Sequence, residues 1–194
     1  MTIKTIQNSV MNSCTYVVCA DDMGTCLLID CGEYEPIHEY LTQNKITVKG
    51  VLLTHGHCDH IGGLSSLLQE SPEIPIYTTA EGVKEIKDSR SNLSFFTGNP
   101  IEIESFNAVE VSEGSEISYE GLPAIQVFCT PGHDNSELSY CIGDNLFTGD
   151  AYIPGIEVLY KYPRGNKQQA LDSEARLKDL EQKGYHVFCG HHSY

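Results

Sequence analysis

Four side chains that can bind a metal ion occupy six consecutive positions of the sequence, in the segment His55-Gly56-His57-Cys58-Asp59-His60. The segment follows the apolar run 50–54, which predicts a buried strand, and its glycine leaves the backbone room to turn. A strand end is rigid, and the turn beyond it lets the four side chains point into a shared space. Because imidazole and carboxylate ligands together suit zinc, iron or manganese better than calcium or magnesium, the segment predicts a site for one of those three metals.

Three further candidate ligands occur later in the chain, each directly after a glycine that ends or follows an apolar run: His133, Asp150 and His191. One such residue alone carries little information, since a single histidine is more often an ordinary surface or core residue. Three apolar runs that each end in a glycine and a candidate ligand, together with the segment 55–60, indicate a second metal ion. His192 is the alternative to His191, and the position directly after Gly190 favours His191.

A pair of metal ions would account for catalysis without a serine or cysteine nucleophile. Two ions about 4 Å apart can share a water molecule, lower its pKa toward roughly 7 and polarise the bond that it attacks. Asp59 is the expected catalytic residue, because it would bind metal and help to orient the shared hydroxide. Each metal-bound imidazole should donate its other N–H to a further acceptor, which the sequence does not identify.

Strands and helices alternate in both halves of the chain. We expect strands at residues 14–19, 25–30, 50–54, 74–77, 108–111, 116–119, 125–129, 138–142, 145–147 and 185–189. We expect helices at 36–43, 62–69, 81–89 and 167–182, and a polar loop at 91–100. Two packed sheets with helices on their outer faces would bury every apolar face, in one domain spanning residues 1–194.

Composition narrows the class of function. The chain has 194 residues, 40% of them apolar and 20% charged, as in an ordinary soluble globular protein. A net charge of −15 argues against a nucleic-acid partner, because phosphate contacts rely on clustered lysine and arginine. No apolar run approaches the roughly 20 residues of a membrane helix, and the N-terminus lacks the layout of a secretion signal. We therefore expect a cytoplasmic protein with reduced cysteines that acts on a small molecule, without a membrane partner.

Two of the few basic residues, Lys161 and Arg164, follow Asp150 closely. They could bind a carboxylate or phosphate of the substrate, which arginine can do with two hydrogen bonds. The alternative, which the sequence slightly favours, is a solvated loop before the helix at 167–182.

The seven-residue pattern resembles the signature of the metallo-β-lactamase superfamily, in which a His-x-His-x-Asp-His segment is followed by a His, an Asp and a His at strand ends. The resemblance runs from about residue 10 to the end of the chain. It implies an α/β fold of the four-layer αββα type, with two mixed sheets and the metal site at one edge between them. It also implies two zinc ions, with iron or manganese as alternatives, held by His55, His57 and His133, by Asp59, His60 and His191, and by Asp150 as the ligand shared between them.

A bridging aspartate resembles glyoxalase II and related thioester or ester hydrolases more than the true β-lactamases. The resemblance therefore predicts a hydrolase of a small thioester, ester or lactone, without the C-terminal helical domain with which glyoxalase II helps to hold glutathione. The segment after His133 departs from the family pattern and is one residue shorter. The alternative activity on this fold is an iron persulfide dioxygenase, which uses one iron at positions matching His55, His133 and Asp150. A non-catalytic relative is a third possibility, but such a protein would normally have lost ligands.

Overall fold

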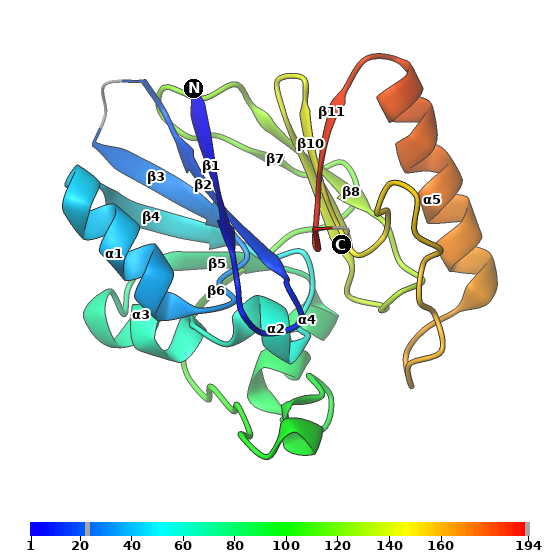
Figure 1. Cartoon of the computed structure of the whole chain (residues 1–194), viewed down its shortest axis with the longest axis horizontal. Helices are drawn as coiled ribbons and strands as arrows, with labels where there is room; N and C mark the ends of the chain where they lie inside the picture. The colour runs from blue at the N-terminus through cyan, green and yellow to red at the C-terminus, as the bar shows by residue number, and fades with distance from the viewer. Residues whose placement is uncertain (22–23, 193–194) are drawn as a thin grey trace.

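Two β-sheets lie face to face in the computed structural model, with helices on both outer sides (Figure 1). The structure describes residues 1–21 and 24–192. The strand order is β1-β2-β3-β4-β5-β6 in the first sheet and β11-β10-β9-β8-β7 in the second. This arrangement is the predicted four-layer α/β sandwich.

The first sheet is mixed. Its strands are β1 (Thr2–Gln7), β2 (Cys14–Cys19), β3 (Thr25–Ile29), β4 (Thr47–Leu52), β5 (Pro75–Thr78) and β6 (Asn107–Glu110). The first three strands pair in antiparallel fashion, and β3 to β6 run parallel. The edge strand β1 was not predicted, because its alternation of threonine, lysine and glutamine with two isoleucines hides a strand that is largely exposed.

The second sheet is also mixed. Its strands are β7 (Glu116–Ile117), β8 (Ile125–Cys129), β9 (Leu138–Ile142), β10 (Asn145–Gly149) and β11 (His186–Cys189). Only β10 and β11 are parallel, and the other neighbours are antiparallel. Because β8 and β10 both run antiparallel to β9, the C-terminal ends of β8, β10 and β11 lie at the same edge of this sheet. That edge carries part of the candidate site.

The helices form the two outer layers. They are α1 (Tyr34–Asn44), α2 (Cys58–Ile61), α3 (Leu64–Glu70), α4 (Ala80–Lys87), the 3-10 helix η1 (Ser94–Thr97) and α5 (Lys167–Gln182). Figure 1 shows α1 and α3 against the first sheet and α5 against the second. The predicted helix at 62–69 corresponds to α3, whereas the short helix α2, which was not predicted, carries part of the segment 55–60. None of the helices in the described part of the chain combines the length and apolar character that crossing a bilayer requires.

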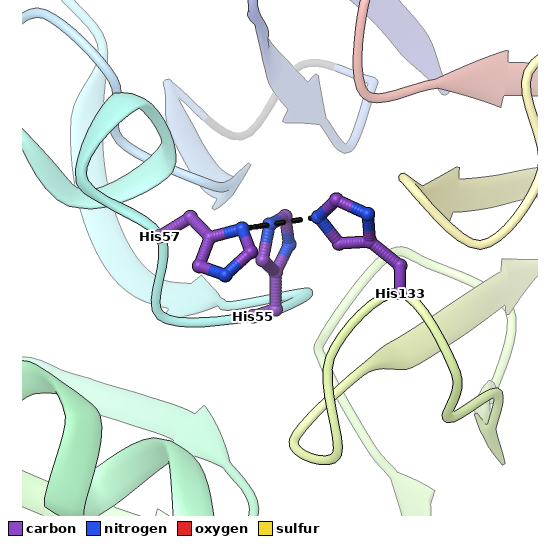
Figure 2. Close-up of side chains that lie close together, drawn as sticks. All are labelled: His55, His57 and His133. Atoms are coloured by element: carbon purple, nitrogen blue, oxygen red, sulfur yellow. Dashed lines mark hydrogen bonds between the residues drawn. The ribbon is translucent and has the colours of Figure 1, made fainter. Parts of the chain in front are cut away.

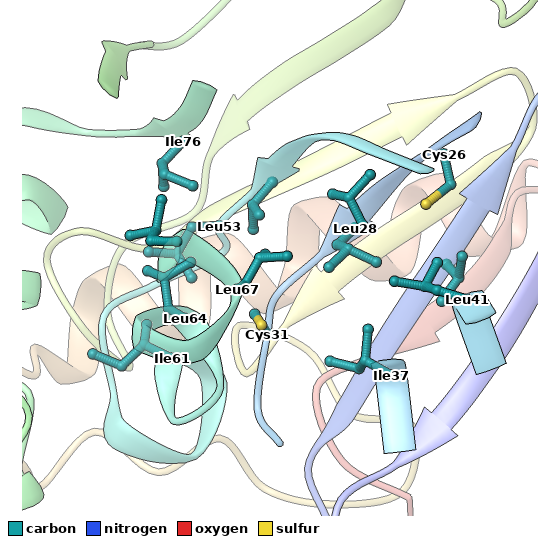
Figure 3. Packing of buried hydrophobic residues seen from close by; sticks show 14 of the residues in the cluster. Cys26, Leu28, Cys31, Ile37, Leu41, Leu53, Ile61, Leu64, Leu67 and Ile76 are labelled. Carbon is teal, nitrogen blue, oxygen red and sulfur yellow. The ribbon is translucent and has the colours of Figure 1, made fainter. Parts of the chain in front are cut away.

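Three hydrophobic layers hold this sandwich together, and β3 shows why. Successive side chains of a strand point to opposite faces. Cys26 and Leu28 therefore pack under the helices, whereas Leu27 and Ile29 pack between the sheets. Figure 3 shows the helical layer, in which α1 and α3 direct apolar side chains toward β3. A third cluster, centred on Leu177, joins α5 to the second sheet.

Candidate metal centre

The seven predicted ligands converge at one edge of the sandwich, just beyond the ends of four strands. The segment 55–60 follows β4, and the other three residues follow β8, β10 and β11. Their ligand atoms form three groups, in each of which the atoms lie within 4.8 Å of one another. The groups are His55, His57 and His133; His55, His60 and Asp150; and Asp59, His60 and His191. All seven side chains are thus brought together.

Three imidazoles form the first group, and Figure 2 shows their rings pointing toward one another from two separate loops. The Nδ1 atom of His57 lies 3.1 Å from Nε2 of His55 and 3.0 Å from Nε2 of His133. All three rings are buried. Three nitrogen atoms converging from different directions are a suitable set of ligands for one metal ion.

The other two groups share His60 and together form a second ligand group around Asp59 and Asp150. The Oδ2 atom of Asp59 lies 3.5 Å from Nε2 of His60 and 3.4 Å from Nε2 of His191. The carboxylate of Asp150 lies 3.2 Å from His191, 3.6 Å from His60 and 3.5 Å from His133. Asp150 therefore contacts members of both ligand groups, which is the position that a shared ligand requires.

The charges and the burial of these side chains suit the binding of cations. Burial and the neighbouring imidazoles lower the pKa of His55 well below its ordinary value, so this ring is in the neutral form that binds metal. Burial would also lower the pKa of His60, but the carboxylates of Asp59, Asp30 and Asp150 outweigh it and raise that pKa well above its ordinary value. The Oδ1 atom of Asp150 is buried without a hydrogen-bond partner in the protein. A cation would neutralise this concentration of carboxylates and bind the unpaired oxygen.

A family model described as the Metallo-beta-lactamase superfamily matches residues 9–192. The chain belongs to this superfamily. A hydroxyacylglutathione hydrolase from Edwardsiella ictaluri is 32% identical over 171 residues, which cover 86% of this chain and 57% of that protein. One from Cronobacter sakazakii is 34% identical over 172 residues, covering 88% of this chain and 59% of the relative. The chain therefore spans less than two thirds of the length of these relatives.

Solved structures of the superfamily share the fold over almost the whole chain. The BLEG-1 B3 metallo-beta-lactamase superposes with a TM-score of 0.81 at 25% identity, covering 99% of this chain and 92% of that one. ETHE1 from Myxococcus xanthus superposes with a TM-score of 0.75 at 25% identity, covering 100% of this chain and 76% of that one.

The hydrogen-bond acceptors that orient the candidate ligand histidines are visible only in the structure. Nδ1 of His133 donates to the backbone oxygen of Leu159 over 2.7 Å, and Nδ1 of His191 donates to that of Met11 over 2.9 Å. These bonds leave Nε2 of each ring directed into the site. An imidazole held in this way keeps one tautomer and one orientation, which raises metal affinity.

Asp30 links two of the candidate ligand histidines and was not predicted. Its carboxylate accepts hydrogen bonds from the backbone N–H of Thr54 over 2.7 Å, from the Thr54 hydroxyl over 2.8 Å and from Nδ1 of His60 over 2.8 Å. The same hydroxyl lies 3.1 Å from Nδ1 of His55. Asp30 directly follows β3 and is buried. Its position at the end of an apolar strand is a signal that could have identified Asp30, although no glycine precedes it as Gly149 precedes Asp150.

Arg164 is bound by protein carboxylates. Its guanidinium lies 2.9 Å from Oδ2 of Asp134 and 3.1 Å from Oε1 of Glu85. The same oxygen of Asp134 lies 3.5 Å from Nε2 of His57, and the other oxygen of Glu85 accepts the backbone N–H of Gly56 over 2.9 Å. Arg164 thus pairs with the two side chains that contact His57 and Gly56 in the segment 55–60. A substrate role for Arg164 or Lys161 stays a prediction.

Replacing Arg164 with methionine should destabilise the fold by about 2 kcal/mol. Breaking a buried ion pair leaves an uncompensated charge, and the partial exposure of Arg164 reduces that cost. Lys161→Met is the matched control, since Lys161 is exposed, and it should stay within about 0.5 kcal/mol of the native protein. The measurement is the free energy of unfolding in urea. Equal values for the two variants would contradict the supporting role of Arg164.

Proposed function

We propose that the seven side chains hold two divalent metal ions, zinc in the first instance, and that the protein hydrolyses a small thioester, ester or lactone. The observation that carries this proposal is the position of Asp150 between the two groups of ligands, with one buried oxygen unpaired. The relatives named hydroxyacylglutathione hydrolase support hydrolysis of an acyl substrate. Two divalent ions supply Lewis acidity, which lowers the pKa of water and polarises a carbonyl group.

The residues of the chain contribute position and orientation. Asp59, His57, His133, Asp150 and His191 line one cleft of about 660 Å³, so a substrate in this cleft meets both ligand groups at once. Asp59 is the proposed catalytic residue, because its carboxylate faces the cleft beside the ligands of the second group. A substrate held between the groups needs no further nucleophile from the protein.

Elemental analysis of the protein purified without chelator tests the metal proposal. We expect close to two metal ions per chain, and removal of the metals should reduce hydrolysis to the uncatalysed rate. The substrates to compare are thioesters, lactones, phosphoesters and β-lactams, and readdition of zinc, iron and manganese identifies the metal that restores activity. Unchanged activity in a metal-free chain would end the proposal.

The alternative activity gives a different result in the same preparation. An iron persulfide dioxygenase would contain a single iron and consume oxygen when supplied with a thiol persulfide. Oxygen uptake of this kind, together with no hydrolysis of any acyl substrate, would replace the hydrolase proposal with the dioxygenase.

A further inference from the structure

The cleft above the predicted ligands has an apolar wall built from three separate segments. The turn between β1 and β2 contributes Met11, η1 contributes Phe96, and the loop after β10 contributes Ile156 and Leu159. These side chains are 61%, 70%, 40% and 59% exposed, respectively. Soluble proteins rarely leave such apolar side chains together at the surface unless something binds there. The volume of about 660 Å³ suits a small molecule.

The backbone holds part of this wall in an unusual conformation. Met11 has a φ of 54° and Leu93 a φ of 67°, and both side chains line the cleft. Bulky residues rarely adopt the left-handed region, and where they do, the strained positions tend to lie at ligand sites. The backbone therefore holds the apolar wall in a defined position. The exposure of its side chains is not simply that of residues in a loop.

The described side chains that line the cleft offer no lysine or arginine to bind an anionic group of a substrate. Glu157 adds a carboxylate to those of Asp59 and Asp150. Two arginines line a smaller adjacent cavity of about 260 Å³. Arg164 pairs with Asp134, and the guanidinium of Arg90 lies 4.0 Å from the centre of the Phe95 ring.

We infer that the apolar wall of the cleft binds an uncharged, apolar acyl group, so that the substrates are thioesters or esters of aliphatic acids. This inference rests on the hydrolase function proposed above. In the reaction, the oxygen of water bonds to the acyl carbon, the C–S or C–O bond breaks, and a proton passes to the leaving sulfur or oxygen. A carboxylic acid and a thiol or alcohol result.

Two series of thioesters test the inference on the metal-loaded protein. The first joins acyl groups from acetyl to octanoyl to N-acetylcysteamine, which is uncharged, and the second joins the same acyl groups to glutathione. We expect kcat/KM to rise about threefold for each added methylene until the cleft is filled. At each chain length the two series should show the same rise, because the acyl group and not the leaving group contacts the apolar wall. A flat response to chain length in either series would overturn the inference.

A binding measurement separates this inference from the hydrolase proposal. The probe is 1-N-phenylnaphthylamine, an uncharged apolar dye whose fluorescence increases when it leaves water. The double variant Phe96→Ser/Ile156→Ser should weaken dye binding at least about fivefold and flatten the chain-length response. Leu171→Ser is the matched control, because Leu171 is 46% exposed on α5, outside the cleft, and should bind the dye as the native protein does.

The outcomes of the two measurements are distinct. Equal dye binding by the native protein, the double variant and Leu171→Ser would contradict the inference that the apolar wall is a binding site, even if thioesters are hydrolysed. Dye binding that is lost only in the double variant, with no hydrolysis of any thioester, would support the apolar cleft and contradict the proposed function.

Discussion

Replacing Asp150 with alanine should reduce kcat/KM at least about a thousandfold and lower the metal content of the purified protein. Asp150 lies within 3.6 Å of His60, His133 and His191, so its loss affects both groups of ligands. If the two ions act together, several kcal/mol of stabilisation of the reacting carbonyl disappear with their shared ligand. The measurements are elemental analysis and the hydrolysis rate of the best acyl substrate.

Asp144→Ala is the matched control for this variant. Asp144 lies in the turn before β10, it is 71% exposed, and its carboxylate pairs with the exposed His186. Its loss should leave the rate and the metal content within about twofold of the native values. Both variants should keep the native circular dichroism spectrum. Native activity in Asp150→Ala would show that the converging side chains are not the catalytic site.

Replacing Asp30 with alanine should lower the free energy of unfolding by about 3 kcal/mol and weaken metal binding about 10- to 100-fold. The change leaves the N–H and hydroxyl of Thr54 and the Nδ1 of His60 without their acceptor in the interior. Unpaired buried donors cost about 1–3 kcal/mol each, although relaxation recovers part of that cost. The loss of metal affinity follows because His60 is no longer held in one orientation.

Asp30→Asn separates the two effects. Asparagine tolerates the backbone φ of 60° at this position, and its amide oxygen can still accept a hydrogen bond from Thr54. It cannot supply the negative charge that faces His60. We therefore expect Asp30→Asn to recover much of the stability but little of the metal affinity, as measured by urea unfolding and by competition with a zinc chelator. Asp172→Ala, on the exposed side of α5, is the control and should change neither quantity. Equal stability and metal affinity in Asp30→Ala and the native protein would contradict the linking role of Asp30.

Much of the architecture could be predicted because its signals are local. The apolar runs at 125–129 and 138–142 coincide with β8 and β9, and the helix at 167–182 coincides with α5. The prediction was weaker where the local signal was faint. It missed β1, whose pattern is largely polar, and it missed the short helix α2, which lies inside the segment of candidate ligands.

The sequence by itself determined which side chains can bind metal and which strand ends they follow. Parallel strand ends meet at one edge of a sheet, so the short segments around His133, Asp150 and His191 already implied their convergence. Only the tertiary structure decided what supports those side chains. Nδ1 of His60 meets Asp30, 30 positions away, and Nδ1 of His191 meets Met11, 180 positions away.

The tertiary structure also decided the partners of Arg164 and the lining of the cleft. The sequence showed a cation near Asp150, but the packing of the chain placed its guanidinium on Asp134 and Glu85. The apolar wall is likewise assembled from three segments, and nothing in the sequence of one segment indicates that it contacts the others. The physical reason is that a residue's type and its neighbours in the chain determine what it can bind, whereas its actual partner depends on contacts between distant segments, which only folding brings together.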